Sequence, residues 1–346
     1  MGNGALHHEW CYVSGLVNVL ECKLLNTIFF DRLLSSNVLG DMLINLNNTT
    51  LKTYFTHVKH LYEFETLLDD YYYTRLYEIR SLAPDSTVCD FFLIKNDILN
   101  LKNFVKLKAC GTGVDKYSRE TIDKNKYDDT WNDEAVSLPE VIKETVSLSK
   151  KSMTAVKKEE LPFVIDLIID GAYLKYIENI HKTIKVEIIK RYMMAYQFIK
   201  GFEVLRRAMA LKLDINLLNK YFLMGFDQCH MLRKLFTDTV RTSEKTFREI
   251  LVETHCNASL QENEMLVRMI SSNTSKNISF QYEVETDNYL LDMIRPVKYT
   301  PFGPERVFGY LCGLTTEVFN LKLVLGGKVH KIGNNLLKER LRKAYV

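Results

Sequence analysis

The stretch from Thr300 to Val346 places the strongest constraint on the fold of this chain. Pro301 and Pro304 stand where the first turn of a helix tolerates a missing N–H, and Gly326-Gly327 can supply a left-handed stop. Between them, aliphatic residues recur at helical spacing: Val307, Leu311, Leu314, Val318, Leu321 and Leu325. We therefore expect one long helix with a buried face, followed by a short helix with Asn334 as its cap.

The end of this stretch is basic, whereas the whole chain is nearly neutral. From Lys322 onward there are seven lysines and arginines against Glu339 alone, a net charge of plus six. The 346-residue chain has a net charge of only +3, which is too small to indicate nucleic-acid binding. With only 6 prolines and 15 glycines, long helices are favoured over a turn-rich β fold, and we expect an all-α protein.

Cysteine usage and hydropathy bear on the compartment. The 7 cysteines contain no Cys-x-x-Cys pair, so neither a disulfide framework nor a zinc ribbon is predicted, and reduced thiols in a cytoplasmic protein are expected. The first eight residues are polar and unlike a secretory leader. No apolar run approaches the roughly 18 residues of a membrane span, so we expect no transmembrane segment.

Helical periodicity recurs along the rest of the chain. It predicts helices over residues 12–36, 58–80, 90–109, 161–184 and 187–213. Residues 115–144 hold nine acidic and five basic side chains and are predicted to form a linker-like polar insertion. Residues 278–284 alternate between polar and apolar side chains, which is a strand pattern, although no partner strand is evident.

Three similar pairs of segments indicate an internal repeat. In each pair, an Asp and a Tyr on an apolar helix precede an aliphatic and basic segment by about thirty residues. The pairs are Asp70 and Tyr73 with Asn100-Leu101-Lys102, Asp170 and Tyr173 with Val204-Leu205-Arg206, and Asp287 and Tyr289 with Asn320-Leu321-Lys322. We therefore expect three pseudo-threefold helical subdomains at residues 1–112, 113–222 (which includes the polar insertion) and 223–346. Chance alignment of leucine- and lysine-bearing helices is the alternative.

No group of residues meets the requirements of an active site. Glu178 with His181, and less well Asp227 with His230, have the spacing that points two ligands on one helix at a metal ion. A dinuclear site would need two further inward-facing glutamates on partner helices. A helical metal-dependent enzyme is therefore a distant alternative, and we expect no catalytic residue, metal or cofactor.

With the repeat and the basic end in view, the sequence resembles the C-type subunits of V/A-type rotary ATPases, a family whose eukaryotic counterpart is the d-type subunit. The motif TPFGPERVFGYLCGLTTEVFNLKLVLGGK is similar to the family's pattern at twelve positions: Pro301, Phe302, Gly303, Glu305, Tyr310, Leu311, Glu317, Asn320, Leu321, Lys322, Gly327 and Lys328. Tyr12 and residues 20–25 resemble the family's opening helix. Leu16 and Asn18 stand where that helix often carries arginines.

This resemblance implies an all-helical funnel of three subdomains without catalytic residues. Such a protein sits on the cytoplasmic end of the membrane proteolipid ring, receives the central stalk, and transmits torque between ATP hydrolysis or synthesis and ion transport. The basic end resembles the bacterial and archaeal branch of the family. A helical-repeat scaffold for other protein partners is the second hypothesis.

The resemblance also suggests which residues meet partner subunits. Basic side chains recur after each repeat, and we expect some of them to face an acidic surface of the stalk or the ring. The candidates are Lys102, Lys106, Arg206, Arg207, Lys322 and Lys328, together with the polar motif residues Glu317 and Asn320. A solvated helix face is the alternative for any one of the basic residues, and Glu317 and Asn320 could instead contact a neighbouring subdomain.

Overall fold

The computed structural model describes residues 9–36, 38–56, 63–111, 122–211, 213–222 and 280–346. Throughout these ranges the regular structure is helical, with one short 3-10 helix and no strand, which confirms the prediction of an all-α fold. None of the helices in these ranges is long and apolar enough to cross a membrane.

The chain forms two compact units. Unit 1 comprises residues 1–89, 186–192 and 268–346, and unit 2 comprises residues 90–185 and 193–267. The helices of unit 1 are α2 (Cys11–Glu21), α3 (Thr27–Ser35), α4 (Leu39–Asn47), α5 (Lys52–Phe55), α6 (Phe64–Leu82), α16 (Phe280–Ile294), η2 (Arg295–Tyr299), α17 (Pro304–Val329) and α18 (Asn334–Arg340). Those of unit 2 are α8 (Lys124–Trp131), α9 (Glu140–Ala155), α10 (Leu161–Thr183) and α12 (Ile215–Tyr221). The chain passes between the units within α7 (Thr87–Cys110) and α11 (Glu187–Ala210).

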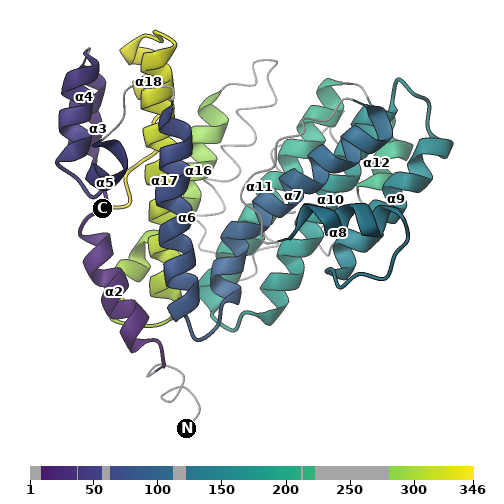
Figure 1. Cartoon of the computed structure of the whole chain (residues 1–346), viewed down its shortest axis with the longest axis horizontal. Coiled ribbons are helices and arrows are strands. Elements are labelled where there is room, and N and C mark those ends of the chain that lie inside the picture. The colour runs from purple at the N-terminus through teal and green to yellow at the C-terminus, as the bar shows by residue number, and fades with distance from the viewer. Residues whose placement is uncertain (1–8, 37, 57–62, 112–121, 212, 223–279) are drawn as a thin grey trace, which may run out of the picture. The chain divides into compact units, whose positions relative to one another are not determined.

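Helix α17 is the centre of unit 1, where α2, α6 and α16 pack against it (Figure 1). The predicted leucine stripe is buried, since Leu311, Leu314 and Leu321 are all 0% exposed. Burial extends beyond one face, because Phe308, Tyr310 and Val324 are also covered. A helix covered on most sides is a core helix, and each fully buried leucine contributes about 1.5–3 kcal/mol relative to an exposed one.

The predicted stop at Gly326-Gly327 is wrong, because α17 continues to Val329. These glycines serve close packing instead: a Cβ on Gly327 would lie 2.3 Å from Leu337 Cδ2 of α18. The left-handed residue beyond the helix is Lys331, with φ of 55°. The short helix α18 has Gly333 rather than Asn334 at its N-cap.

The residues after α18 lie along α17 as a strap, which we define as residues 341–346. Tyr345 covers Gly309 and Gly313, where an added Cβ would come within 2.7 Å of the ring or its hydroxyl. The Arg295 guanidinium donates to the carbonyl oxygens of Ala344 and Tyr345. The glycine pair therefore makes room for an aromatic side chain that the strap supplies.

The single helix predicted over residues 12–36 is in fact two helices, α2 and α3. Asn26 caps α3, where its side chain accepts a hydrogen bond from the Phe29 N–H at 3.0 Å. An asparagine that caps a new helix favours an extended backbone at its own position, here with ψ of 174°. We refer to residues 22–26 between the two helices as the α2–α3 turn.

In unit 2, α10 packs against α9 and α12, and α7 runs beside it (Figure 1). The predicted boundaries of α10 and α11 agree with the structure to within three residues. The expected polar insertion over 115–144 is partly wrong, because residues 124–131 form α8 and α9 begins at Glu140. The side chains of Ile122 and Tyr127 are buried there, so a segment of polar composition still supplies core residues.

The strand predicted over 278–284 is also wrong for its described part, because residues 280–284 belong to α16. Tyr282, Thr286, Tyr289 and Leu290 are buried at helical spacing. The alternation covered only four apolar residues, whereas the helical period continues to Ile294, and the longer pattern prevails.

The three predicted repeat copies each fall on two consecutive long helices: α6 with α7, α10 with α11, and α16 with α17. The leucine of each second segment, Leu101, Leu205 or Leu321, is at most 1% exposed. The division into three subdomains and the funnel shape stay predictions, and residues 223–279 of the third subdomain lie outside the described residues.

Candidate functional site

The polar side chains around α17 form a buried set that we call the α17 polar network: Glu21, Arg306, Glu317, Asn320 and Arg342. All five are at most 9% exposed. Buried polar groups require partners, because an unsatisfied one costs about 1–3 kcal/mol and a charged one more. Their contacts therefore show what the family-like motif does inside the chain.

Glu317 joins three parts of unit 1. Its carboxylate accepts a hydrogen bond from the Leu25 N–H of the α2–α3 turn at 2.5 Å and one from the Tyr71 hydroxyl of α6 at 3.1 Å. Burial raises the pKa of Glu317 from its ordinary 4.5 to about 7, while the two donors act in the opposite direction. The side chain is turned inward toward these two donors, and its place in a partner surface stays a prediction.

Arg306 and Glu21 make an ion pair between α17 and α2, with Nη2 and Oε2 3.0 Å apart. Arg306 Nε also donates to Asn18 Oδ1 at 2.8 Å. Burial raises the pKa of Glu21, and the Arg306 charge opposes that rise. Asn18 of α2 thus serves as an acceptor for an arginine from α17.

Asn320 and Arg342 fasten the strap. The Asn320 amide donates to the Arg342 carbonyl oxygen at 2.9 Å and accepts from the Arg342 N–H at 3.0 Å. The Arg342 side chain pairs with Asp287 of α16 at 2.9 Å and lies over the Phe319 ring. Asn320 is 0% exposed, and this two-way amide contact accounts for an asparagine on the buried face of a leucine-rich helix.

Unit 2 holds a second set of charged residues, the α10 charge cluster: Lys102, Lys106, Asp166, Asp170 and Arg207. Asp166 lies 2.7 Å from Lys102 Nζ and 2.8 Å from Lys106 Nζ, so α10 is tied to α7. Arg207 of α11 lies 2.9 Å from Asp170. Burial raises the pKa of Asp170, and Lys102 and Arg207 oppose the rise. Unlike the α17 polar network, this cluster is partly open to solvent.

The remaining basic candidates also have contacts within the chain. Lys322 pairs with Asp69 of α6 at 2.6 Å. Lys328 donates to the Leu34 carbonyl oxygen at 2.6 Å and to Asn334 Oδ1 at 2.9 Å, and desolvation lowers its pKa. Arg206 lies in α11, but its side chain is outside what the structure describes. Of the candidates with described side chains, Arg207 is the most open, with 58% of its side chain exposed.

Comparison with known families gives a match over almost the whole chain. The model of the ATP synthase (C/AC39) subunit family matches residues 13–340. The chain belongs to this family. It is therefore a V/A-type ATPase subunit of the C/d type, as the motif resemblance implied. A search of curated proteins returned no match.

The family match includes the whole α17 polar network except Arg342, which lies two residues beyond its end. Sequence reasoning named Glu317 and Asn320 but missed Glu21, Arg306 and Arg342. Arg306 stands directly before the apolar residues Val307 and Phe308 of the expected core helix, and a charged residue in that place was an available signal. The four-residue spacing of Gly309 and Gly313 was a signal for the strap, because two small residues on one helix face allow another segment to approach closely.

The alternative metal site has only part of its residues in the described ranges. Glu178 forms an ion pair with Lys182, and Asp227 and His230 lie outside those ranges. Among the residues that can be described, no group of three His, Cys, Asp or Glu side chains is placed to hold a metal ion.

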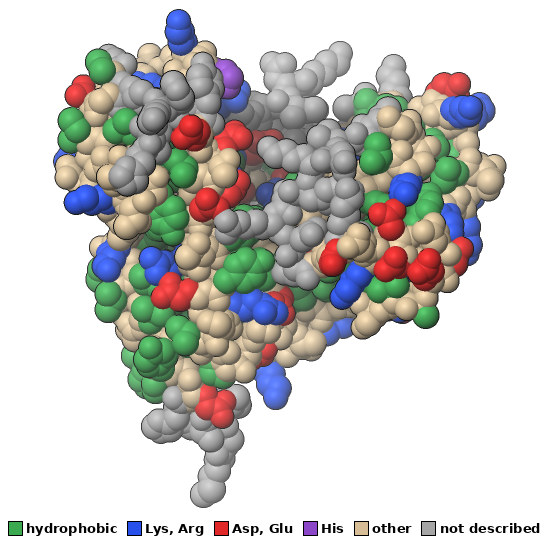
Figure 2. Space-filling model, viewed as in Figure 1, with side chains coloured by type: hydrophobic (Ala, Val, Ile, Leu, Met, Phe, Trp, Pro, Cys, Tyr) green, Lys and Arg blue, Asp and Glu red, His purple; other side chains and the backbone are tan. Residues whose placement is uncertain are grey.

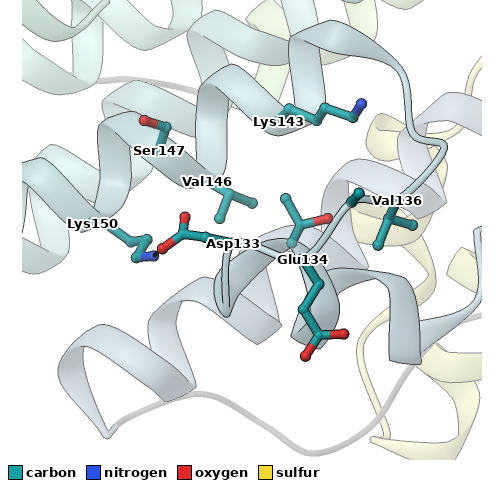
Figure 3. Close-up of a pocket in the computed structure, with 9 residues that line it drawn as sticks. Asp133, Glu134, Val136, Lys143, Val146, Ser147 and Lys150 are labelled. Atoms are coloured by element: carbon teal, nitrogen blue, oxygen red, sulfur yellow. Dashed lines mark hydrogen bonds and ion pairs between the residues drawn. The ribbon is translucent and has the colours of Figure 1, made fainter.

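One surface hollow of about 240 Å³ lies in unit 2, between α9 and the connection from α8. Figure 3 shows Lys150 reaching toward Asp133 at its edge, where Nζ and Oδ2 are 2.7 Å apart. Lys150 also donates to the Trp131 carbonyl oxygen. These contacts tie α9 to the α8–α9 connection, and they engage Lys150 within the chain.

The surface of unit 1 carries exposed apolar side chains over α2, seen as the green area in Figure 2. Tyr12 and Val19 of α2 and Tyr299 and Phe302 before α17 are all more than 40% exposed. The Gly303 N–H donates to Ser14 Oγ at 3.1 Å, which brings the two segments together. These four side chains therefore place apolar surface on the outside of unit 1.

Proposed function

We propose that this chain is the non-catalytic central-stalk subunit of a V/A-type ATPase, which seats the rotor stalk on the proteolipid ring at the cytoplasmic face of the membrane. It passes torque between ATP hydrolysis or synthesis and ion transport. The observation that carries the proposal is the family match over residues 13–340. A match of that extent includes described residues of both units, which supports a proposal made for the whole chain.

Stiffness within each unit supports this role. A part that transmits torque must resist bending, and ties between neighbouring long helices oppose it. In unit 1, Lys322 and Arg306 tie α17 to α6 and α2. In unit 2, Asp166 and Asp170 tie α10 to α7 and α11.

Affinity purification from native membranes tests membership of the complex. The tagged chain should bring down ATPase head subunits and proteolipid from gently solubilised membranes, and high salt should weaken the association if charges contribute. The control is a preparation in which head and ring subunits stay assembled with each other. If the chain is recovered from it with other proteins and without those subunits, the scaffold hypothesis is favoured.

The basic candidates need a test that separates a partner contact from an internal tie. Lys322→Asp places two carboxylates together at the Asp69 contact, so loss of assembly in that variant is ambiguous. The double variant Lys322→Asp with Asp69→Lys restores an ion pair and reverses the charge at each position. If Lys322 meets a partner, the double variant keeps its stability and loses co-purification; if Lys322 is an internal tie, co-purification returns.

A further inference from the structure

Glu317 is an ionisable side chain at a position where its structural contacts do not require a charge. A glutamine could accept from Leu25 and contact Tyr71 without a charge, yet the chain places an ionisable group there. The side chain is 4% exposed, and its hydrogen-bond donors are one backbone N–H and one phenol. Among the described residues no lysine, arginine or histidine forms an ion pair with it.

The groups that face Glu317 are neutral at ordinary pH or remain beyond its contact distance. Tyr71 comes from α6 and also meets Thr50, and Tyr310 comes from α17 itself. Burial raises the pKa of both phenols, so neither supplies a charge. Glu21, paired with Arg306, and Arg75 with Glu78 interact with Tyr310, not with Glu317. The ionised carboxylate is therefore buried without a cation to compensate it.

We propose that protonated Glu317 keeps the α2–α3 turn packed against α17 and α6, and that loss of its proton loosens the turn from both helices. The protonated carboxyl keeps an oxygen for the Leu25 N–H and an O–H to share with Tyr71. The ionised carboxyl keeps both acceptors but bears a desolvated charge, which water can reach only when the turn moves away. Opening of the turn is thus favoured by deprotonation.

The direction with pH follows from the pKa of Glu317, about 7 in the folded protein against 4.5 ordinarily. Between these values the closed state holds a proton that the open state releases, so closure weakens as pH rises. Above a pH of about 7 the closed state is not weakened further, because Glu317 is then ionised in both states. A single linked proton limits the change in the opening equilibrium to tenfold for each pH unit.

Hydrogen exchange at the Leu25 amide, corrected for its intrinsic pH dependence, measures this opening directly. In the full chain we expect protection to fall severalfold per unit from pH 5 to 7 and to level off by pH 8. Glu317→Gln should give a flat profile, because it keeps an acceptor for Leu25 and cannot ionise. Glu339→Gln, which removes an exposed acid of the same unit, should leave the wild-type slope.

A wild-type profile that is flat, or a Glu317→Gln profile with the wild-type slope, would overturn the proposal. If Glu317→Gln does not fold, Tyr71→Phe provides the second route. Loss of the phenol removes a donor to the carboxylate, so the fall in protection should continue to a higher pH. An unchanged midpoint in Tyr71→Phe would count against the proposal in the same way. These hydrogen-exchange measurements use the chain alone, so their outcome does not depend on the proposed role in an ATPase.

Discussion

Both units tie long helices together with charged and polar side chains, but they do so at different depths. The α17 polar network is at most 9% exposed, and its members bond to one another and to buried backbone. In the α10 charge cluster the side chains are 22–58% exposed. The same type of contact is therefore expected to contribute very differently to the stability of the two units.

The physical reason is desolvation. A half-exposed lysine or aspartate that loses its partner regains water, so its ion pair contributes only about 0–1 kcal/mol. A buried charge that loses its partner remains in a medium of low polarity, at a cost of about 3–5 kcal/mol. Single substitutions of polar residues should therefore lower the free energy of unfolding more in unit 1 than in unit 2.

The largest effect is expected for Arg306→Ala, which removes the ion-pair partner of the buried Glu21 and leaves Lys298 as the other cation that acts on it. We predict a loss of about 3–5 kcal/mol in the free energy of unfolding of unit 1. Hydrogen exchange resolved by peptide separates unit 1 from unit 2. Replacing both partners, with Arg306→Met and Glu21→Leu, should recover much of the loss, since no charge is then left unpaired. An Arg306→Ala protein as stable as the wild type would show that water reaches Glu21.

A smaller loss is expected when Gly313 gains a methyl group. The Cβ of Gly313→Ala would lie 2.7 Å from Tyr345 Cγ, so the strap must shift. We predict a cost of about 1–3 kcal/mol by urea unfolding, together with faster exchange of the strap amides. Gly15→Ala in α2 is the matched control, because nothing lies within 4 Å of its added Cβ. That variant should be neutral or gain up to about 1 kcal/mol from helix propensity. Equal effects at both glycines would contradict the packing assigned to Tyr345.

The smallest effect is expected for Lys102→Ala in the α10 charge cluster. Asp166 keeps Lys106 at 2.8 Å, and its side chain is 30% exposed. We predict a loss of less than about 1 kcal/mol, reduced further in 1 M salt because exposed pairs are screened. A loss as large as that of Arg306→Ala, unaffected by salt, would remove the distinction between the two units.

Periodicity and end signals predicted the long helices well, because α6, α7, α10, α11 and α17 each carry buried side chains over many turns. They failed where one residue acts through a distant partner. Gly326-Gly327 has the composition of a helix stop, and its use as a packing surface depends on Leu337 of the next helix. The break at the α2–α3 turn likewise depends on Glu317, almost 300 residues away, as well as on the local cap of Asn26.

The candidate residues show the same limit. The motif predicted which positions of α17 are special, but not which way they face. Glu317 and Asn320 have polar side chains, and only the strap and the α2–α3 turn make them core residues. Lys102, Lys106 and Lys322 have acidic partners on α10 and α6, which the sequence places 64, 60 and 253 residues away from them. No local pattern specifies such a pairing.

The most direct measurement of the proposed role is ATP-driven ion uptake by membrane vesicles prepared with and without this chain. We predict that vesicles lacking the chain keep ATP hydrolysis by the head and lose ion uptake, and that adding the purified chain restores uptake. Full uptake in its absence, or loss of hydrolysis by the isolated head, would contradict a non-catalytic role in coupling the stalk to the ring.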